Sequence, residues 1–178
     1  MLKKFKSYLP DFFNRKNSVF EKSYQLESGM FFARTMVPGD IKQAIQVERV
    51  VYAGEVPWTK SAFLSELYSL HTHLYLVLFH QEQMIGFVGL RITGSDGHVT
   101  NIAVLPDFQS RGLGSLLLAE VEQFARKNNC QTLSLEVRVS NVDAQRLYRT
   151  KGFESRKILS AYYSENQEDA VDMVKVLA

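Results

Sequence analysis

From residue 31 onward, the apolar positions follow two alternating spacings, one typical of strands and one typical of helices. The run "FFART" predicts a first strand. A helix-start signal at 38–40 is followed by apolar residues at mostly helical spacing, namely Ile41, Ala44, Ile45, Val47 and Val51. A second helix is expected after Thr59, whose hydroxyl suits an N-cap, with the apolar positions Phe63, Leu64 and Leu67.

Three further apolar runs predict an antiparallel meander. The first two are "LYLVLF" at 74–79 and "MIGFVGLRI" at 84–92, and a short polar turn separates them. The sequence "GSDG" at 94–97 turns the chain again. The third run, 98–105, ends at Pro106, which cannot donate a backbone hydrogen bond to a strand ladder.

The remaining chain predicts two more helices and three more strands. Residues 106–127 begin as a glycine-interrupted turn and continue as an amphipathic helix. The run "TLSLEVRV" at 132–139 alternates apolar and polar residues, as a half-buried strand does. Ser140 and Asn141 supply N-cap chemistry for a short helix that ends at Gly152, and late strands are expected near 153–159 and 170–177.

Together these elements predict one α/β (α+β) domain over residues 31–178, with a mixed, mostly antiparallel central sheet and flanking helices. Residues 1–30 mix basic and aromatic side chains and predict an N-terminal extension, either a short amphipathic helix or a loosely ordered arm. Residues 1–24 contain six basic and two acidic residues, and this excess accounts for the whole net positive charge of the chain. We expect this arm to be unstructured or to pack on the domain rather than to contact RNA or the ribosome.

Composition narrows the function classes further. With 178 residues and 46% apolar content, the chain is long enough for one compact domain with a sizeable core. Its net charge of +2 falls short of the strongly basic profile of a dedicated nucleic-acid binder. No apolar run approaches the roughly 20 residues of a membrane-spanning helix, and no secretory signal is recognisable. We therefore expect a cytoplasmic protein without a membrane partner.

The cysteine and histidines predict no additional site. Cys130 is the only cysteine, so an intramolecular disulfide and a multi-cysteine zinc site are excluded, and we expect it to be structural rather than nucleophilic. His71 and His73 could nominally ligate a metal, but no third ligand is evident, so no metal is expected. Solvated or turn positions are expected for all four histidines, which are His71, His73, His80 and His98.

The turn "QSRGLGS" at 109–115 has the chemistry of an anion site. A helix N-terminus presents unpaired backbone N–H groups and a partial positive charge, and glycines let a phosphate approach the backbone closely. Two glycines could equally serve only to turn the chain from strand to helix. The spacing is neither the dinucleotide fingerprint, because Leu117 stands at its third glycine, nor a Walker A loop.

Two segments carry a family resemblance. The run "NIAVLPDFQSRGLGSLLL", followed by "LSLEVRVSNVDAQRLYRTKGF", resembles the GNAT superfamily of acetyl-CoA-dependent N-acetyltransferases, whose pyrophosphate turn is matched by Gln109, Gly112 and Gly114. The runs "NIAV", "LEVR", "LY", "GF" and "YY…EDA" are similar to the ribosomal-protein-alanine N-acetyltransferases of RimI type, and "VPWT" resembles their substrate loop. The resemblance covers roughly residues 31–178 and implies the GNAT fold, with an acetyl-CoA cleft between two splayed parallel strands.

The same resemblance implies how acetyl-CoA is held. The pantetheine arm would pair with the strand backbone at Ile102, Ala103 and Val104, as an added strand does. The pyrophosphate would lie on the turn residues Gln109, Ser110, Arg111, Gly112, Leu113, Gly114 and Ser115. Asn141 matches the family's asparagine that reaches the pantetheine, although a side chain serving only as a helix cap would look identical in the sequence.

Two residues match the family's proton-transfer groups. Glu136 matches the glutamate that acts as general base, directly or through water, and Tyr148 the tyrosine that protonates the departing thiolate. The alternatives are a strand glutamate facing solvent and a packing tyrosine. An α-amine has a pKa near 7.7–8.0 and a lysine amine one near 10.4, so an N-terminal acceptor needs only a modest base.

The acceptor is less defined than the donor. The resemblance nominates the N-terminal amine of a ribosomal protein, with a peptide groove shaped by Trp58, Tyr162 and Tyr163. The segment 163–168 is shorter than is usual in the RimI pattern, and the basic arm is extra. The alternatives are acetylation of a small-molecule amine or a lysine side chain, and a CoA-binding regulatory module that does not catalyse.

Overall fold

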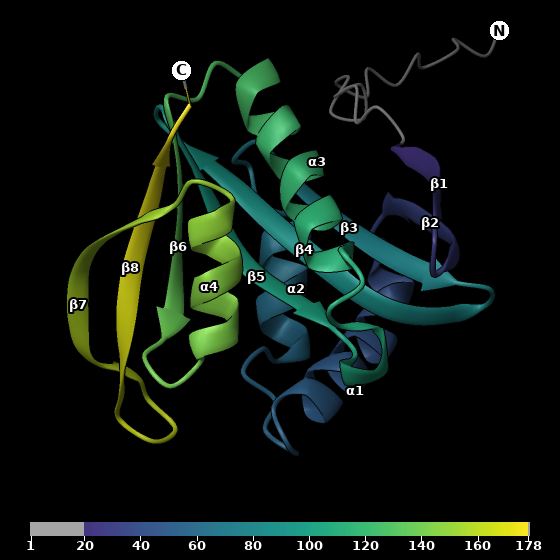
Figure 1. Ribbon diagram of the computed structural model, residues 1–178, viewed down its shortest axis with the longest axis horizontal. Coiled ribbons are helices and arrows are strands. Elements are labelled where there is room, and N and C mark those ends of the chain that lie inside the picture. Colours follow the sequence, from purple (N-terminus) through teal and green to yellow (C-terminus); the bar gives the residue numbers. More distant parts are fainter. Residues whose placement is uncertain (1–19, 178) are drawn as a thin grey trace, which may run out of the picture.

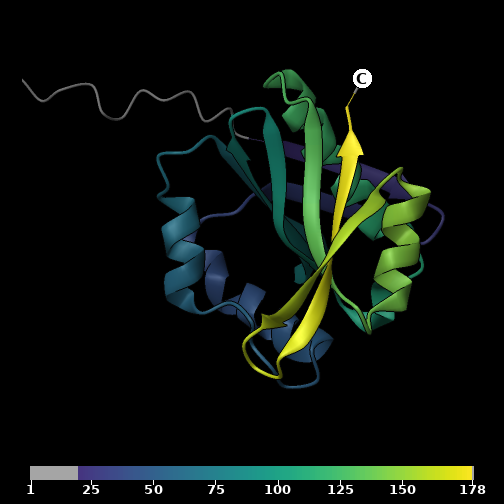
Figure 2. The same ribbon diagram turned by 90° about the vertical axis from the view of Figure 1, so that its left-hand side faces the viewer.

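The computed structural model describes residues 20–177 as one continuous eight-stranded sheet with helices on both faces (Figures 1 and 2). The strand order is β1-β2-β3-β4-β5-β6-β8-β7. The strands are β1 (Glu21–Leu26), β2 (Gly29–Thr35), β3 (His73–His80), β4 (Gln83–Thr93), β5 (Asp96–Val104), β6 (Thr132–Arg138), β7 (Glu154–Tyr163) and β8 (Glu168–Val176). The predicted α/β class and mixed, mostly antiparallel sheet are confirmed.

One pair of neighbouring strands runs parallel, and its pairing is short. β5 and β6 are in register only from Asp96 opposite Thr132 to His98 opposite Ser134. Beyond this point the two strands diverge, and α4 (Val142–Thr150) lies in front of the gap in Figure 1. Each strand keeps its antiparallel neighbour on the other side, β4 for β5 and β8 for β6. The backbone edges that face the gap therefore have no strand partner there.

The helices divide between the two faces of the sheet. α1 (Ile41–Val51) and α2 (Lys60–Leu67) cover one face, and α3 (Leu113–Lys127) and α4 cover the other, as the edge-on view of Figure 2 shows. Two separate apolar clusters result, one containing Ile41 and Phe63 and the other Leu117 and Val121. None of the helices in the described region is long and apolar enough to cross a membrane.

Local chemistry at the helix ends matches the predicted signals. The Thr59 hydroxyl accepts a hydrogen bond from the Ala62 N–H at 3.2 Å, and the Asn141 side chain accepts one from the Ala144 N–H at 3.1 Å. Gly152, which follows α4, has a φ of +88°, a conformation that favours glycine. The predicted N-caps and the glycine stop are thus confirmed.

The N-terminal side of the sheet differs from the prediction. Residues 21–30 were expected in an extension, but β1 pairs antiparallel with β2 along its whole length. Lys22 also forms an ion pair with Glu120 of α3 at 2.6 Å. The sheet therefore begins about ten residues earlier than the apolar pattern indicates. The expected helix or arm over residues 1–19 lies outside the described residues.

Candidate active site

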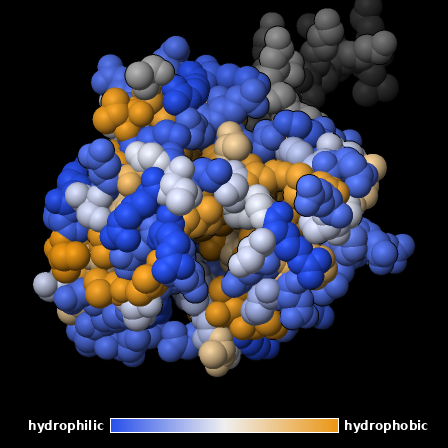
Figure 3. Space-filling view, viewed as in Figure 1, coloured by the Kyte–Doolittle hydropathy of each residue, from blue (hydrophilic) through white to orange (hydrophobic). Residues whose placement is uncertain are grey.

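The divergence of β5 and β6 opens a cavity of about 640 Å³. Its walls are β5 from 99 to 104, the turn before α3, β6 from 135 to 138, much of α4, and α1 with the loop that follows it. Figure 3 shows the face that carries α3 and α4 hollowed near its centre, with apolar surface inside. Two ends of one cavity therefore meet at the gap in the sheet, one beside α3 and one beside α1.

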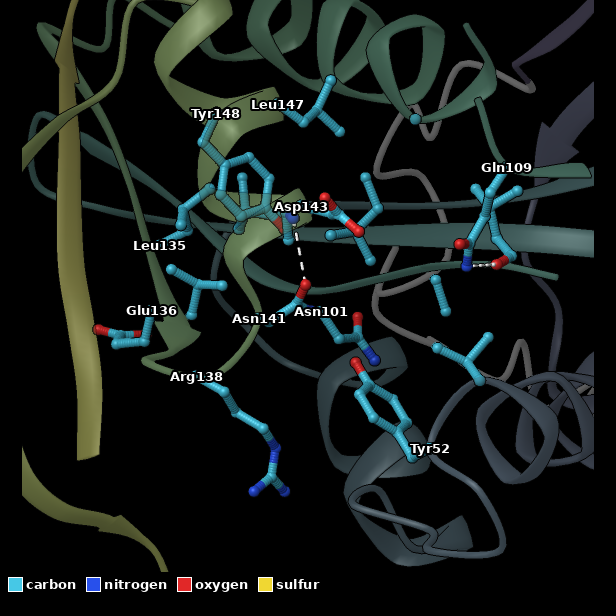
Figure 4. Close-up of a pocket in the computed structure, with 18 of the residues that line it drawn as sticks. Tyr52, Asn101, Gln109, Leu135, Glu136, Arg138, Asn141, Asp143, Leu147 and Tyr148 are labelled. Atoms are coloured by element: carbon cyan, nitrogen blue, oxygen red, sulfur yellow. Dashed lines mark hydrogen bonds between the residues drawn. The ribbon is translucent and has the colours of Figure 1, made fainter. Parts of the chain in front are cut away.

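The turn before α3 has the backbone conformation that the sequence indicates. Gly112 precedes the helix with a φ of +82°, and α3 begins at Leu113. The Gln109 side chain donates a hydrogen bond from Nε2 to the Val104 carbonyl at 2.8 Å, which ties the turn to the end of β5 (Figure 4). The N-terminal end of α3 thus opens into the cavity, where its first N–H groups can hold an anion.

Gly114 differs from Gly112 in its surroundings. A Cβ atom built at Gly114 would lie 3.1 Å from the Leu147 Cδ2 atom of α4, whereas one at Gly112 meets nothing within 4 Å. The first glycine therefore serves the left-handed turn, and the second permits the close approach of α3 and α4. Both helices border the cavity, so the two glycines shape its opening rather than only turning the chain.

Most of the predicted site residues lie together. The cavity is lined by the predicted residues Trp58, Ile102, Ala103, Val104, Gln109, Ser110, Gly112, Gly114, Ser115, Glu136, Asn141, Tyr148 and Tyr163. Three predicted residues are placed elsewhere. The Arg111 guanidinium stacks over the Phe108 ring at 5.2 Å, Leu113 is buried in the core and can offer only its backbone, and Tyr162 is 47% exposed outside the lining.

Glu136 lies on β6 just beyond the last paired residues of the two parallel strands. Its Oε2 atom is 3.2 Å from the Nε2 atom of His98 on β5, and both side chains are about one fifth exposed. In Figure 4 its carboxylate points away from Asn141 and Tyr148. The sequence analysis placed His98 at a solvated or turn position; that expectation was wrong, because His98 is in a central strand beside the predicted base.

Tyr148 borders the cavity from α4, where its side chain is only 6% exposed. Burial, and then the neighbouring hydroxyls of Tyr52 and Tyr163, raise the pKa of the Tyr148 phenol far above its ordinary value. The hydroxyl therefore carries its proton at neutral pH. A buried, protonated phenol at this point can donate a proton to a leaving group.

The wall beside α1 contains residues that the sequence analysis missed. Glu48 is 1% exposed, and its Oε2 atom accepts a hydrogen bond from the Trp58 backbone N–H at 3.1 Å. Burial raises the pKa of Glu48 to about 7, although that hydrogen bond opposes the shift. Tyr52 also lines the cavity, and Figure 4 shows its hydroxyl directed toward the Asn101 side chain. A signal existed, because Glu48 falls on the apolar face of α1.

Arg138 joins the loops on either side of this wall. Its guanidinium stacks over the Tyr163 ring at 4.1 Å and forms ion pairs with Glu168 at 3.1 Å and Glu55 at 3.5 Å. Glu168 also accepts a hydrogen bond from the Ser140 N–H at 2.9 Å. These contacts lower the pKa of Glu168 to about 2, with the Ser140 bonds as the largest cause. Arg138 therefore links the β7–β8 turn to the loop after α1.

Cys130 has no connection to the cavity. Its side chain is 6% exposed, and burial, followed by the charge of Asp96, raises the pKa of the thiol. A neutral buried thiol is a poor nucleophile, as the sequence analysis expected.

Comparison with known proteins agrees with this geometry. The family model described as "Acetyltransferase (GNAT) family" matches residues 42–153. The chain is 35% identical over 140 residues to a provisionally named ribosomal protein bS18-alanine N-acetyltransferase of Bacillus subtilis (strain 168), covering 79% of this chain and 91% of that protein. It is also 35% identical over 136 residues to the bS18-alanine N-acetyltransferase of Salmonella typhimurium (strain LT2), covering 75% and 89%.

A solved structure extends the similarity to three dimensions. The crystal structure of the ribosomal-protein-S18-alanine N-acetyltransferase from Escherichia coli superimposes with a TM-score of 0.73 at 30% identity, covering 84% of this chain and 95% of that one. The family match includes the turn before α3, the splayed strands and α4, which are the parts that form the cavity. The chain belongs to the GNAT family of N-acetyltransferases and resembles the RimI-type ribosomal-protein-alanine enzymes within it.

Proposed function

We propose that this enzyme transfers the acetyl group of acetyl-CoA directly to the N-terminal α-amine of a ribosomal protein. The observation that carries the proposal is the single cavity that passes through the gap between β5 and β6. It is bordered by the glycine turn on one side of the sheet, and by Glu136 and the α1 wall on the other. The similarity to bS18-alanine N-acetyltransferases supports this choice of acceptor.

The donor would bind mainly through the backbone. The N–H groups at the start of α3 suit the pyrophosphate, since a helix N-terminus attracts anions. The edge of β5 at Ile102, Ala103 and Val104, which has no neighbouring strand on the gap side, suits the amides of the pantetheine, which would pair with it as an added strand. Asn141 uses its Oδ1 atom to cap α4, and its Nδ2 atom remains for the same ligand. The thioester would then lie at the gap between β5 and β6, with Tyr148 on one side of the sheet and Glu136 on the other.

The reaction follows from these positions. The neutral amine nitrogen attacks the thioester carbonyl carbon, and one N–H proton passes to Glu136, directly or through water. A backbone N–H of β5 would stabilise the oxyanion of the tetrahedral intermediate. When the carbon–sulfur bond breaks, the thiolate takes the proton of the Tyr148 hydroxyl. Solvent returns a proton to the phenolate, the amide and free CoA leave, and Glu136 loses its proton to regenerate the base.

The acceptor side suits a peptide terminus. Trp58, Tyr52 and Tyr163 supply aromatic walls, and Glu48 and Glu136 supply carboxyl groups that would face the amine of the acceptor. The α-amine loses its proton more readily than a lysine amine, so a single carboxylate base is sufficient at neutral pH. Trp58 is fixed by its backbone bond to Glu48 and by ring contacts with Phe63 and Tyr75, at centroid distances of 5.3 and 6.5 Å.

The acceptor can be tested with a panel of substrates. Peptides that begin with the bS18 N-terminus, peptides with a blocked N-terminus and an internal lysine, and polyamines are incubated with acetyl-CoA, and products are located by mass spectrometry. We expect acetylation at the α-amine of the first set. Acetylation confined to lysine side chains or polyamines would contradict the proposal.

The two proton-transfer roles need separate variants. Glu136→Gln and Tyr148→Phe should each lower kcat by roughly 10²-fold or more while CoA still binds. Glu82→Gln in the β3–β4 turn and Tyr68→Phe after α2 are matched controls, because both residues are exposed outside the cavity. Unchanged turnover in either site variant would remove that residue from the mechanism.

A further inference from the structure

A row of hydrogen-bonded side chains crosses from β5 to β6 where the two strands separate. Because β5 and β6 are parallel and in register there, alternate residues of both strands share one face. That face carries Asp96 and His98 from β5, and Thr132, Ser134 and Glu136 from β6. The row ends at Glu136, the proposed base, and none of its other members has a role in the mechanism above.

Four contacts define the row. Asp96 accepts hydrogen bonds from the Thr132 and Ser134 hydroxyls, each at 2.6 Å. The Ser134 Oγ atom lies 3.0 Å from the His98 Nδ1 atom. The His98 Nε2 atom, on the other side of the ring, lies 3.2 Å from the Glu136 Oε2 atom. The imidazole therefore separates two carboxylates, one reached through a hydroxyl and one reached directly.

These contacts specify where the histidine proton lies. The hydroxyl hydrogen of Ser134 is committed to Asp96, since an ionised carboxylate can only accept. Ser134 Oγ can then only accept from His98, so Nδ1 must carry a hydrogen. The second ring nitrogen, Nε2, is left with a lone pair directed at Glu136 whenever the ring is neutral. One further proton between Nε2 and Oε2 satisfies both atoms.

We propose that His98 is a positioning residue for Glu136. Its ring holds the Glu136 carboxylate toward the acceptor and then takes from that carboxylate the proton removed from the amine. This inference rests on the proposed function of Glu136 as the base. The amine N–H proton moves first to Glu136 and then to His98 Nε2, which forms an imidazolium and regenerates the carboxylate. Asp96 stabilises that cation through Ser134, and the partly exposed ring releases the proton to solvent.

The other charged groups around this row are already paired. Arg91, opposite His98 on β4, forms an ion pair with Glu66 of α2. Asp172, opposite Glu136 on β8, is bound by Arg156 of β7 at 2.9 Å. Tyr162 of β7 is close enough that burial and the Glu136 charge raise the pKa of its hydroxyl. Within the described residues, His98 is the only cation-forming group in direct contact with Glu136.

The position of the ring proton can be measured without any substrate. We would record 15N chemical shifts of the full-length protein labelled at histidine, assign His98 by comparison with His98→Gln, and follow its two nitrogens across pH. In the neutral ring we expect the hydrogen on Nδ1 and a bare Nε2. Ser134→Ala should shift the ring toward the Nε2–H tautomer. A neutral His98 with a bare Nδ1 in the wild-type protein would overturn the proposal.

Kinetics then test the proton transfer. His98→Gln keeps an N–H group for Glu136 but cannot accept a proton, so kcat should fall about 10-fold or more with CoA affinity unchanged. The dependence of kcat on pH should also change, because the ring is then no longer available to hold the removed proton. His73→Gln is the matched control, since its ring hydrogen-bonds to the His71 carbonyl, packs against the Tyr75 ring and lies outside the cavity.

The outcomes separate the two proposals. A kcat and pH profile of His98→Gln identical to wild type would show that His98 has no part in the reaction, even if Glu136 is essential. If Glu136→Gln retains full activity, the proposed base fails, while the 15N measurement still decides whether the hydrogen-bonded row exists. Restoration of turnover in His98→Ala by added imidazoles, with a rate that depends on their basicity, would support proton acceptance over a purely structural role.

Discussion

The two ends of the cavity are built in different ways. The end beside α3 includes five residues of one short turn, Gln109, Ser110, Gly112, Gly114 and Ser115, and the donor-binding groups that we propose there are mainly backbone N–H groups. The end beside α1 is made by side chains from four distant segments, including Glu48, Arg138 and Tyr163. A ligand common to a whole family can be held by backbone, whereas an acceptor that differs between enzymes requires side chains that can change independently.

The largest expected effect is a loss of binding at the end beside α3, which we call the donor end, with the end beside α1, the acceptor end, left intact. Gly112→Val places a β-branched residue at a φ of +82°, which distorts the turn, so CoA affinity should fall roughly 100-fold, or about 2.7 kcal/mol. Gly112→Asn is the matched control, because asparagine tolerates the left-handed conformation and a Cβ there meets nothing within 4 Å. Calorimetric titration with CoA compares the two, and equal affinities would contradict the required conformation.

A second prediction concerns the free energy of unfolding, which the buried Glu48 carboxyl at the acceptor end lowers at neutral and higher pH. The pKa of Glu48 is raised from 4.5 to about 7, so between these values the folded state binds more protons than the unfolded state. The free energy of unfolding contributed by this group is therefore fully present below pH 4.5 and is lost as pH rises through 7.

Replacing the acid removes that loss. Glu48→Gln keeps an oxygen for the Trp58 N–H, and should be more stable than wild type by about 2 kcal/mol at pH 8, with the difference shrinking toward pH 4.5. Urea unfolding at several pH values measures it, with Glu82→Gln as the exposed control. A difference that does not depend on pH would show that the buried charge is not its cause.

The third prediction breaks the acceptor end without touching the donor. Arg138→Gln removes the ion pairs to Glu55 and Glu168 and the stacking on Tyr163, so KM for the peptide should rise about 10-fold, or about 1.4 kcal/mol. CoA affinity should not change. Lys127→Gln, at the exposed end of α3, is the control. An equal loss of CoA binding would show that the two ends are not independent.

The smallest effect concerns Asn141, which caps α4 and is also proposed to contact CoA. Asn141→Ala should cost about 1 kcal/mol of stability, because the cap of α4 is lost, and should also weaken CoA binding. Asn141→Asp restores an oxygen for the Ala144 N–H but not the amide N–H groups. We expect it to recover stability and not affinity in parallel unfolding and binding measurements. Full recovery of both would make Asn141 a cap only.

The same contrast explains what the sequence could predict. The hairpin, the caps at Thr59 and Asn141, and the turn at 109–115 all depend on neighbours within a few residues, so their patterns are visible in one sequence. β1 was missed because "EKSYQL" presents little apolar pattern; its exposed residues are held by backbone pairing with β2 and by Lys22. Such an edge strand depends on a partner, not on its own composition.

The site followed the same division. The glycine turn, Glu136 and Tyr148 lie within two motifs, and the structure places all of them around one cavity, although their roles stay predictions. Glu48 was missed because its charge interrupts an apolar helix face, and only the loop at Trp58 shows what its carboxylate binds. His98 was missed because the strand register that brings it to Ser134 and Glu136 joins residues 36 and 38 positions apart.

The short parallel pairing of β5 with β6 has a mechanical consequence. Only three residue pairs join the half-sheet β1–β5 to the half-sheet β6–β8 along this seam. A molecule that pairs with the open edge of β5 and also contacts β6 adds hydrogen bonds where the pairing between the two strands stops. Binding of such a ligand and the association of the two half-sheets are therefore coupled, and a ligand that fills the seam stabilises the fold as well as serving as a substrate.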